Sequence, residues 1–157
     1  MARANLIVQT EVTEAFTRAQ EQRNVRLFKV TIDQERLCLQ QTINSVGSVE
    51  EDFSLIISES LLEQSEAAFL LYCLDDLSTN TTEGLLWLLI TWIPDGCRVR
   101  DKMLYSSSIR DLKSTLGIGF FKSHDYAVSI VDDLSWKQYQ ESINREVNDE
   151  ILTEKER

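Results

Sequence analysis

The chain is poor in the residues that break a fold or staple it together. Its 157 residues include one proline, five glycines and three cysteines. So few prolines and glycines exclude a collagen-like or linker-like chain. Cys38, Cys73 and Cys97 are odd in number and have no CxxC spacing, which favours reduced thiols in a cytosolic protein over a disulfide framework.

Positive charge and long apolar runs are also scarce. The 16 basic residues stand against 26 acidic ones, and the formal net charge is −10. A general nucleic-acid binder needs a surplus of cations, so this class is disfavoured. The longest apolar run, residues 85–92, is far shorter than the roughly 20 residues of a membrane-spanning helix, and no secretory signal is apparent at the N-terminus. We expect one intracellular domain over residues 1–143, with a charged tail or the start of a linker over residues 144–157.

The sequence offers little for catalysis. His124 is the single histidine, and no Gly-x-Ser-x-Gly elbow, metal-ligand spacing or complete dinucleotide fingerprint accompanies it. Acidic clusters at residues 50–52, 75–76 and 132–133 stand where turns and helix N-termini favour acids, so capping and solvation explain them. We therefore expect no enzyme, no metal and no cofactor.

Hydrophobic periodicity predicts an α/β (α+β) chain in the order helix, hairpin, helix, two core strands, helix, strand, helix. Helices are expected over residues 5–22, 49–65 and 98–116 and from residue 136, with a frayed end from residue 144. The second helix should bury one stripe that includes Phe53, Ile57 and Leu61. Strands are expected over residues 25–33, 36–43, 67–75 and 85–93, and an extended piece over residues 119–131. This order indicates a mixed sheet covered by helices on both faces.

The helix over residues 98–116 concentrates the scarce positive charge. Five of the 16 basic residues lie between Arg98 and Lys113. A helix N-terminus already carries about half a positive charge, so each cation in its first turns costs a few tenths of a kcal/mol. Cations at this end of the helix oppose its stability without an evident structural gain, and such a conflict often marks a functional site.

Helical phase divides this helix into two sides. Tyr105, Ile109, Leu112 and Leu116 share the expected core face, whereas Met103 points well round toward the other side. An exposed methionine beside cations is typical of an adaptable protein-binding surface. The alternative is an amphipathic helix with a solvated basic side. The three serines at residues 106–108 predict a bend or a loosened turn.

Residues 92–108 resemble the signature of the ADF-homology domain, the actin-binding module of cofilin, twinfilin and relatives. The motif is Trp-x-Pro-Asp, three further residues, then Val-Arg-x-Lys-Met-x-Tyr-x-Ser-Ser. The segments "RLFKVTID", "FLLYCLD" and "WLLITWIPD" follow in the family's order. Within the family the chain most resembles the first domain of twinfilin, on features that include "EGLLWLLITW".

The resemblance implies a mixed sheet of five to six strands with helices on both faces, and a long helix that lies in the cleft between two actin subdomains. It also implies the residues that contact actin, which are Arg98, Arg100, Lys102, Met103, Ser107, Leu6 and Ile7. A phosphoinositide-binding adaptor would instead use Arg98, Arg110 and Lys113. Actin is acidic, so a basic patch on an acidic chain attracts it while the remaining surface disfavours wrong orientations.

We therefore expect a monomeric, cytoplasmic protein of the actin cytoskeleton that binds actin monomers, preferentially ADP-actin, sequesters them and regulates filament turnover. Three alternatives remain: a filament-side binder of the coactosin or drebrin type, a phosphoinositide-binding adaptor, and a small enzyme that uses His124 or a carboxylate pair. The turn over residues 78–84 has no cation, and residues 2–5 have no serine. Cofilins carry basic residues and a regulatory serine at these places, so filament severing and control by N-terminal phosphorylation are not implied.

Overall fold

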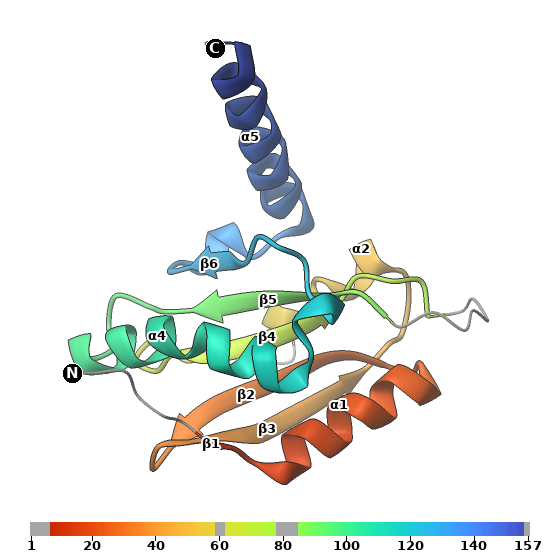
Figure 1. Cartoon of the computed structure of the whole chain (residues 1–157), viewed down its shortest axis with the longest axis vertical. Coiled ribbons are helices and arrows are strands. Elements are labelled where there is room, and N and C mark those ends of the chain that lie inside the picture. The colour runs from red at the N-terminus through yellow and green to blue at the C-terminus, as the bar shows by residue number, and fades with distance from the viewer. Residues whose placement is uncertain (1–6, 59–61, 78–84, 156–157) are drawn as a thin grey trace.

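The structure is a computed structural model that describes residues 7–58, 62–77 and 85–155, with side chains as far as Arg145. Its centre is a mixed sheet of six described strands in the order β1-β3-β2-β4-β5-β6 (Figure 1). The strands are β1 (Ile7–Val8), β2 (Val25–Asp33), β3 (Arg36–Asn44), β4 (Ala68–Cys73), β5 (Trp87–Trp92) and β6 (Tyr126–Val128). Pairing is parallel at β1/β3 and β5/β6 and antiparallel between the other neighbours.

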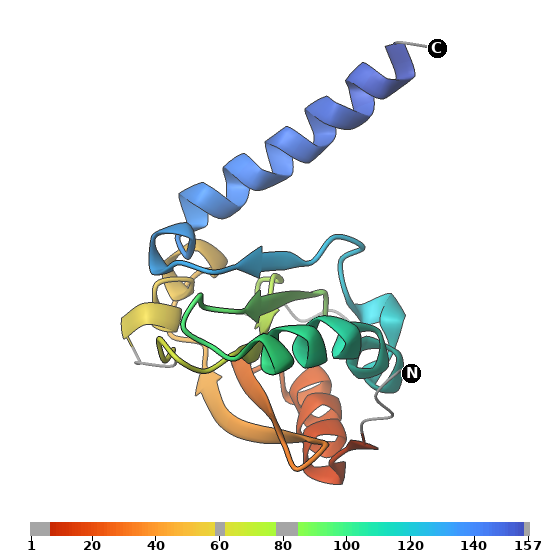
Figure 2. The same ribbon diagram turned by 90° about the vertical axis from the view of Figure 1, so that its left-hand side faces the viewer.

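Helices cover both faces of this sheet (Figure 2). The helices are α1 (Thr10–Gln22), α2 (Val49–Asp52), α3 (Leu55–Ser58), α4 (Val99–Leu116) and α5 (Trp136–Lys155). α1 and α4 share one buried cluster with the sheet, and α2, α3 and the start of α5 share the cluster on the opposite face. Beyond that start, α5 projects away from the body of the fold (Figures 1 and 2). In the part of the chain that the structure describes, no helix has the length and apolarity needed to span a membrane.

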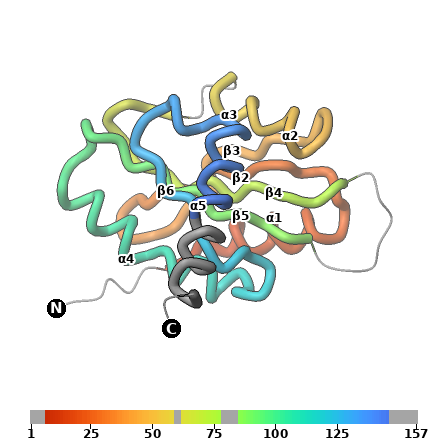
Figure 3. The backbone as a smooth tube through the Cα atoms, turned by 90° about the horizontal axis from the view of Figure 1, so that it is seen from above, coloured from red at the N-terminus to blue at the C-terminus, as the bar shows by residue number. Residues whose placement is uncertain are grey.

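The strand predictions hold where the sequence is most apolar. Every residue of β4 and β5 is buried, because helices lie over both faces of these central strands. β2 and β3 form the predicted hairpin, and the antiparallel pairing runs from Val25 opposite Asn44 to Asp33 opposite Arg36. β2 and β4 are neighbours in the middle of the strand order. Seen from above, α2 and α3 lie on one side of the strands and α4 on the other (Figure 3).

Two helix predictions were wrong. The first helix begins at Thr10 rather than at residue 5, because β1 pairs with the start of β3 and the Gln9 N–H donates to the Leu37 carbonyl at 2.9 Å. The single helix predicted over residues 49–65 is two short ones, α2 and α3. Backbone bonds between them run from residue i to i−3, and the Ser54 hydroxyl donates to the Glu51 carbonyl at 2.9 Å, which competes with a continuous α-helix. Ile57 is exposed rather than in the core, and Leu61 lies outside the described residues.

The C-terminal part also differs from the prediction. The extended piece predicted over residues 119–131 contains two single 3₁₀ turns, Ile118–Phe120 and Val131–Asp133, and only β6 is strand. The last helix begins at Trp136 as predicted, but it continues to Lys155 where a frayed end was expected. The domain boundary at residue 143 stays a prediction.

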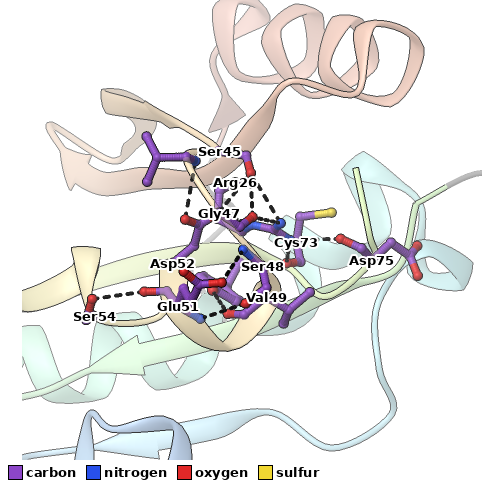
Figure 4. A network of polar contacts seen from close by, with 12 residues as sticks. Arg26, Ser45, Gly47, Ser48, Val49, Glu51, Asp52, Ser54, Cys73 and Asp75 are labelled. Atoms are coloured by element: carbon purple, nitrogen blue, oxygen red, sulfur yellow. Dashed lines mark hydrogen bonds and ion pairs between the residues drawn. The ribbon is translucent and has the colours of Figure 1, made fainter. Parts of the chain in front are cut away.

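A buried ion pair links Arg26 of β2 to Asp52 of α2 (Figure 4). It ties the β2–β3 hairpin to the helices on the sheet face opposite α1 and α4. Arg26 Nε donates to Asp52 Oδ2 at 2.8 Å, and the two side chains are 1% and 0% exposed. Arg26 Nη1 also donates to the carbonyls of Cys73 and Asp75 at 2.7 and 2.8 Å. The acidic cluster at residues 50–52 therefore has two roles. Glu51 completes a capping box at the start of α2, as the capping prediction requires, whereas Asp52 neutralises a buried cation.

Candidate protein-binding site on α4

The inner face of α4 fixes this helix on the sheet. Tyr105, Leu112 and Leu116 are buried and Ile109 is half-buried, so the predicted core face is confirmed. The Tyr105 ring lies 4.9 Å from the Phe69 ring of β4. α4 therefore has one orientation about its own axis, and the opposite side of the helix is presented to solvent.

The outer face of α4 carries both charge and apolar surface. Arg98 and Arg100 are exposed, Lys102 is half-buried, and Met103 is 69% exposed. Val99 is 70% exposed, and it lies one helical turn before Met103 on the same side. Two apolar side chains thus stand among three cations. We did not single out Val99 from the sequence, although its spacing of four residues from Met103 is the signal that finds it.

The start of α4 lacks the usual helix cap. Arg98 is the N-cap residue and its side chain makes no capping hydrogen bond, and the acid of the first turn is Asp101. Ser, Thr, Asp or Asn at this position would accept a hydrogen bond from the first turn. The residues at this end of α4 are therefore poorly suited to helix stability, as the sequence predicted.

The β2–β3 hairpin connects α4 to the N-terminal strand. The Tyr105 hydroxyl accepts a hydrogen bond from the Ile32 N–H at 2.8 Å, and the Glu35 carbonyl accepts one from the Ile7 N–H at 3.4 Å. Burial raises the pKa of Tyr105 to about 12, so its hydroxyl is neutral at physiological pH. Ile7, 62% exposed, thus lies on the same connected framework as α4, while Leu6 lies outside the described residues.

The serine-rich part of α4 belongs to a continuous α-helix. The helix runs unbroken from Val99 to Leu116, and Ser107 is exposed on it. The Ser107 and Ser108 hydroxyls both donate to the Leu104 carbonyl, at 3.1 and 2.6 Å. Serines that bond back to the preceding turn satisfy their own hydroxyls within the helix and often bend it, so the predicted bend or loosened turn stays a prediction.

Near the C-terminal end of α4, Lys113 forms an ion pair within the protein. Lys113 is buried, and its Nζ lies 2.9 Å from Asp125 Oδ1 and 3.3 Å from the Lys122 carbonyl. This placement corrects the expectation that Lys113 is available to a phosphoinositide headgroup, because a nearby carboxylate already neutralises the ammonium group. Arg110 is exposed.

Outside α4, the residues considered for catalysis are the histidine, the cysteines and the acidic pairs. No group of three or more His, Cys, Asp or Glu side chains among them could hold a metal ion. His124 is exposed, and Cys38, Cys73 and Cys97 are free thiols. The exposed Val99 and Met103 among the cations of α4 suit that surface to binding another protein.

Comparison with known proteins agrees with the fold. The family model of the cofilin/tropomyosin-type actin-binding proteins matches residues 5–144. Twinfilin of Dictyostelium discoideum is 33% identical over 133 residues, which are 85% of this chain and 38% of that protein, so the chain spans well under half of that relative. The solved structure of Eh twinfilin is similar with a TM-score of 0.76 at 26% identity, over 90% of this chain and 99% of that one. Human coactosin-like protein, at 10% identity and a TM-score of 0.66 over 92% of both chains, shares the fold. The chain belongs to the cofilin/tropomyosin-type actin-binding family, the family of ADF-homology domains.

Proposed function

We propose that this chain binds actin monomers, preferentially ADP-actin, through the outer face of α4, and so sequesters them and regulates filament assembly in the cytoplasm. One observation carries the proposal. Arg100 and Met103 stand exposed on a helix whose other face is held against the sheet, in a chain of the actin-binding ADF-homology family. The similarity to twinfilin supports the choice of the monomer.

The surface has the composition of a protein interface. Met103 and Val99 offer adaptable apolar area, and Arg98, Arg100 and Lys102 surround them with positive charge. On a chain with a net charge of −10, this patch gives an acidic partner one favourable orientation. Ser107 extends the same face by one turn, and Ile7 is exposed on β1.

The first test is a titration of the purified chain against fluorescently labelled monomeric actin loaded with ADP or with ATP. In the variant Arg100→Ala/Lys102→Ala, the loss of two charged contacts should weaken binding by about 2–5 kcal/mol, more than tenfold in Kd. The matched control is Arg18→Ala/Lys137→Ala, which removes two exposed cations from α1 and α5 and makes the same change in net charge. An equal loss in both variants would indicate a general electrostatic effect, and no loss in either would place the interface elsewhere.

Cosedimentation with filaments separates the proposal from the filament-side alternative. A monomer-sequestering module should stay in the supernatant and should lower the mass of pelleted actin. A coactosin-like binder should pellet with the filaments. The phosphoinositide alternative now depends on Arg98 and Arg110, because Lys113 is engaged with Asp125.

A further inference from the structure

The turn between β2 and β3 has an unfavourable backbone. Gln34 and Glu35 have φ angles of 50° and 63°, in the left-handed region that costs energy for residues with a side chain. Two-residue hairpin turns of this kind strongly prefer Asn followed by Gly. A turn selected for stability alone would therefore carry other residues. Strain of this kind points to a role for the side chains or for the shape that they create.

These strained residues form one wall of a surface groove of about 440 Å³, and the first two turns of α4 form the other wall. Half-buried Ile32 and Leu104 provide apolar surface inside the groove. Exposed Glu35 lies on the hairpin wall and exposed Arg100 on the helix wall. Arg100 is also a proposed actin contact, so the groove is continuous with the outer face of α4.

Hydrogen bonds outside the groove hold its two walls in place. The β2–β4 ladder ends at Val30 opposite Phe69, and two residues further along β2 the Tyr105 hydroxyl of α4 accepts from the Ile32 N–H. Tyr105 thus takes the place of the backbone acceptor that a longer β4 would have supplied. On the other side of the turn, the Glu35 carbonyl accepts from the Ile7 N–H. A groove fixed in this way loses little conformational entropy when it is filled.

The charges around the groove balance. Arg98 and Arg100 on the helix stand against Asp101 and Glu35, so the lining has no single sign that would select a charged side chain. An anchor residue at a protein interface usually fills a pocket with apolar surface inside and a polar rim. The groove therefore fits an uncharged apolar side chain better than a cation or a carboxylate.

We propose that this groove is a second contact of the actin-binding surface, that it takes one apolar side chain of actin, and that Gln34 and Glu35 hold their strained conformations to form it. The proposal rests on the proposed function, since it names actin as the partner. It adds the β2–β3 turn to a surface so far assigned to α4 and β1.

The test replaces the strained turn by the favoured one. In Gln34→Asn/Glu35→Gly the melting temperature should rise, because Asn and Gly adopt left-handed angles readily. Affinity for labelled monomeric actin should fall about fivefold to tenfold, because the Glu35 wall is lost. Opposite changes in stability and affinity are the expected result, since a merely structural turn cannot produce them.

Ile32→Thr tests the nature of the occupant. Threonine keeps the branched shape and the backbone N–H that Tyr105 accepts from, and it places a hydroxyl in the groove, so an apolar occupant should bind less tightly. Arg23→Gly is the control. Arg23 is the third non-glycine residue with a positive φ, 54°, and it lies at the opposite end of the hairpin, so actin affinity should not change.

The parent chain and Arg100→Ala/Lys102→Ala are measured in the same titration. If the parent binds no actin, the proposed function and this inference fail together. If the α4 variant loses affinity and the turn variant does not, this inference alone is refuted. If the turn variant loses affinity while Ile32→Thr keeps it, the apolar occupant is refuted.

Discussion

The substitution Asp52→Ala removes the acid from a buried ion pair and leaves its cation in place. Arg26 and Asp52 are 1% and 0% exposed, so no solvent can replace the missing carboxylate without rearrangement. The substitution also removes the acceptor of the Ser45 hydroxyl, 2.8 Å from Asp52 Oδ2, and of the Val46 N–H, 3.2 Å from Oδ1. The single substitution thus leaves three hydrogen-bond donors without their carboxylate acceptor: Arg26 Nε, the Ser45 hydroxyl and the Val46 N–H.

The expected cost is large for a domain of this size. Removing one partner of a buried ion pair lowers the free energy of unfolding by about 3–5 kcal/mol. The whole free energy of unfolding of a typical protein is about 5–15 kcal/mol. In a domain of this length each kcal/mol corresponds to about 2–4 °C, so we expect the melting temperature to fall by about 6–20 °C. The two carbonyls that still accept from Arg26 Nη1, those of Cys73 and Asp75, keep the cost toward the lower end.

Urea unfolding measured by tryptophan fluorescence gives the free energy directly. Asp132→Ala, at an exposed carboxylate, is the control and should change stability by about 0.5 kcal/mol or less. Arg26→Met/Asp52→Leu removes both charges, and it should recover the part of the loss that comes from the unpaired cation. The Ser45 hydroxyl and the Val46 N–H stay without their acceptor. A cost for Asp52→Ala no larger than that of Asp132→Ala would refute the reasoning, because the backbone carbonyls alone would then hold the cation.

Two further predictions concern α4 and alkaline pH. Tyr105→Phe keeps the ring against Phe69 but leaves the Ile32 N–H without its acceptor, so the unfolding free energy should fall by about 1–3 kcal/mol, and unchanged stability would contradict this role for the hydroxyl. Burial raises the pKa of Cys73 from 9.0 to about 11 and that of Tyr105 from 10.0 to about 12. Both groups hold their protons to higher pH in the folded state than in the unfolded state. Their contribution to the free energy of unfolding is therefore fully present below pH 9 and is lost as pH rises from 9 to 12. The urea midpoint should therefore fall between pH 9 and pH 11, and Cys73→Ala should remove the earliest part of that fall; a midpoint that stays constant would refute the assignment.

Local pattern accounts for the parts of the fold that the sequence predicted. The apolar runs that form β4 and β5 are buried on both faces. Such runs can be recognised as strands without knowing which segments pack on them. The burial pattern of α4 can also be predicted locally. A rotation of 100° per residue places Tyr105 and Leu112 on the buried side and Met103 on the exposed side. The exposed part of the candidate site was therefore visible in the sequence.

The parts that were missed depend on contacts between distant segments. Arg26 alternates with apolar neighbours as a solvent-facing strand residue would, yet it is buried and paired with Asp52. Lys113 belongs to a basic run, but its partner Asp125 comes from a segment after the helix. Nothing within a few residues of either cation distinguishes it from Arg100, which is exposed. Charge patterns along a chain therefore indicate where cations are, and only packing decides which of them a partner can reach.

That division explains why α4 can begin unfavourably. Its start combines an N-cap that makes no capping bond with cations near a positive helix end, which lowers helix stability. Its middle and rear are secured from outside the helix, by the Tyr105 hydroxyl bound to β2 and by Lys113 paired with Asp125. A helix held in this way does not depend on its own first turn for its position. The first turns are thus free to carry Arg98, Arg100 and Met103, residues that serve an interface better than they serve the helix.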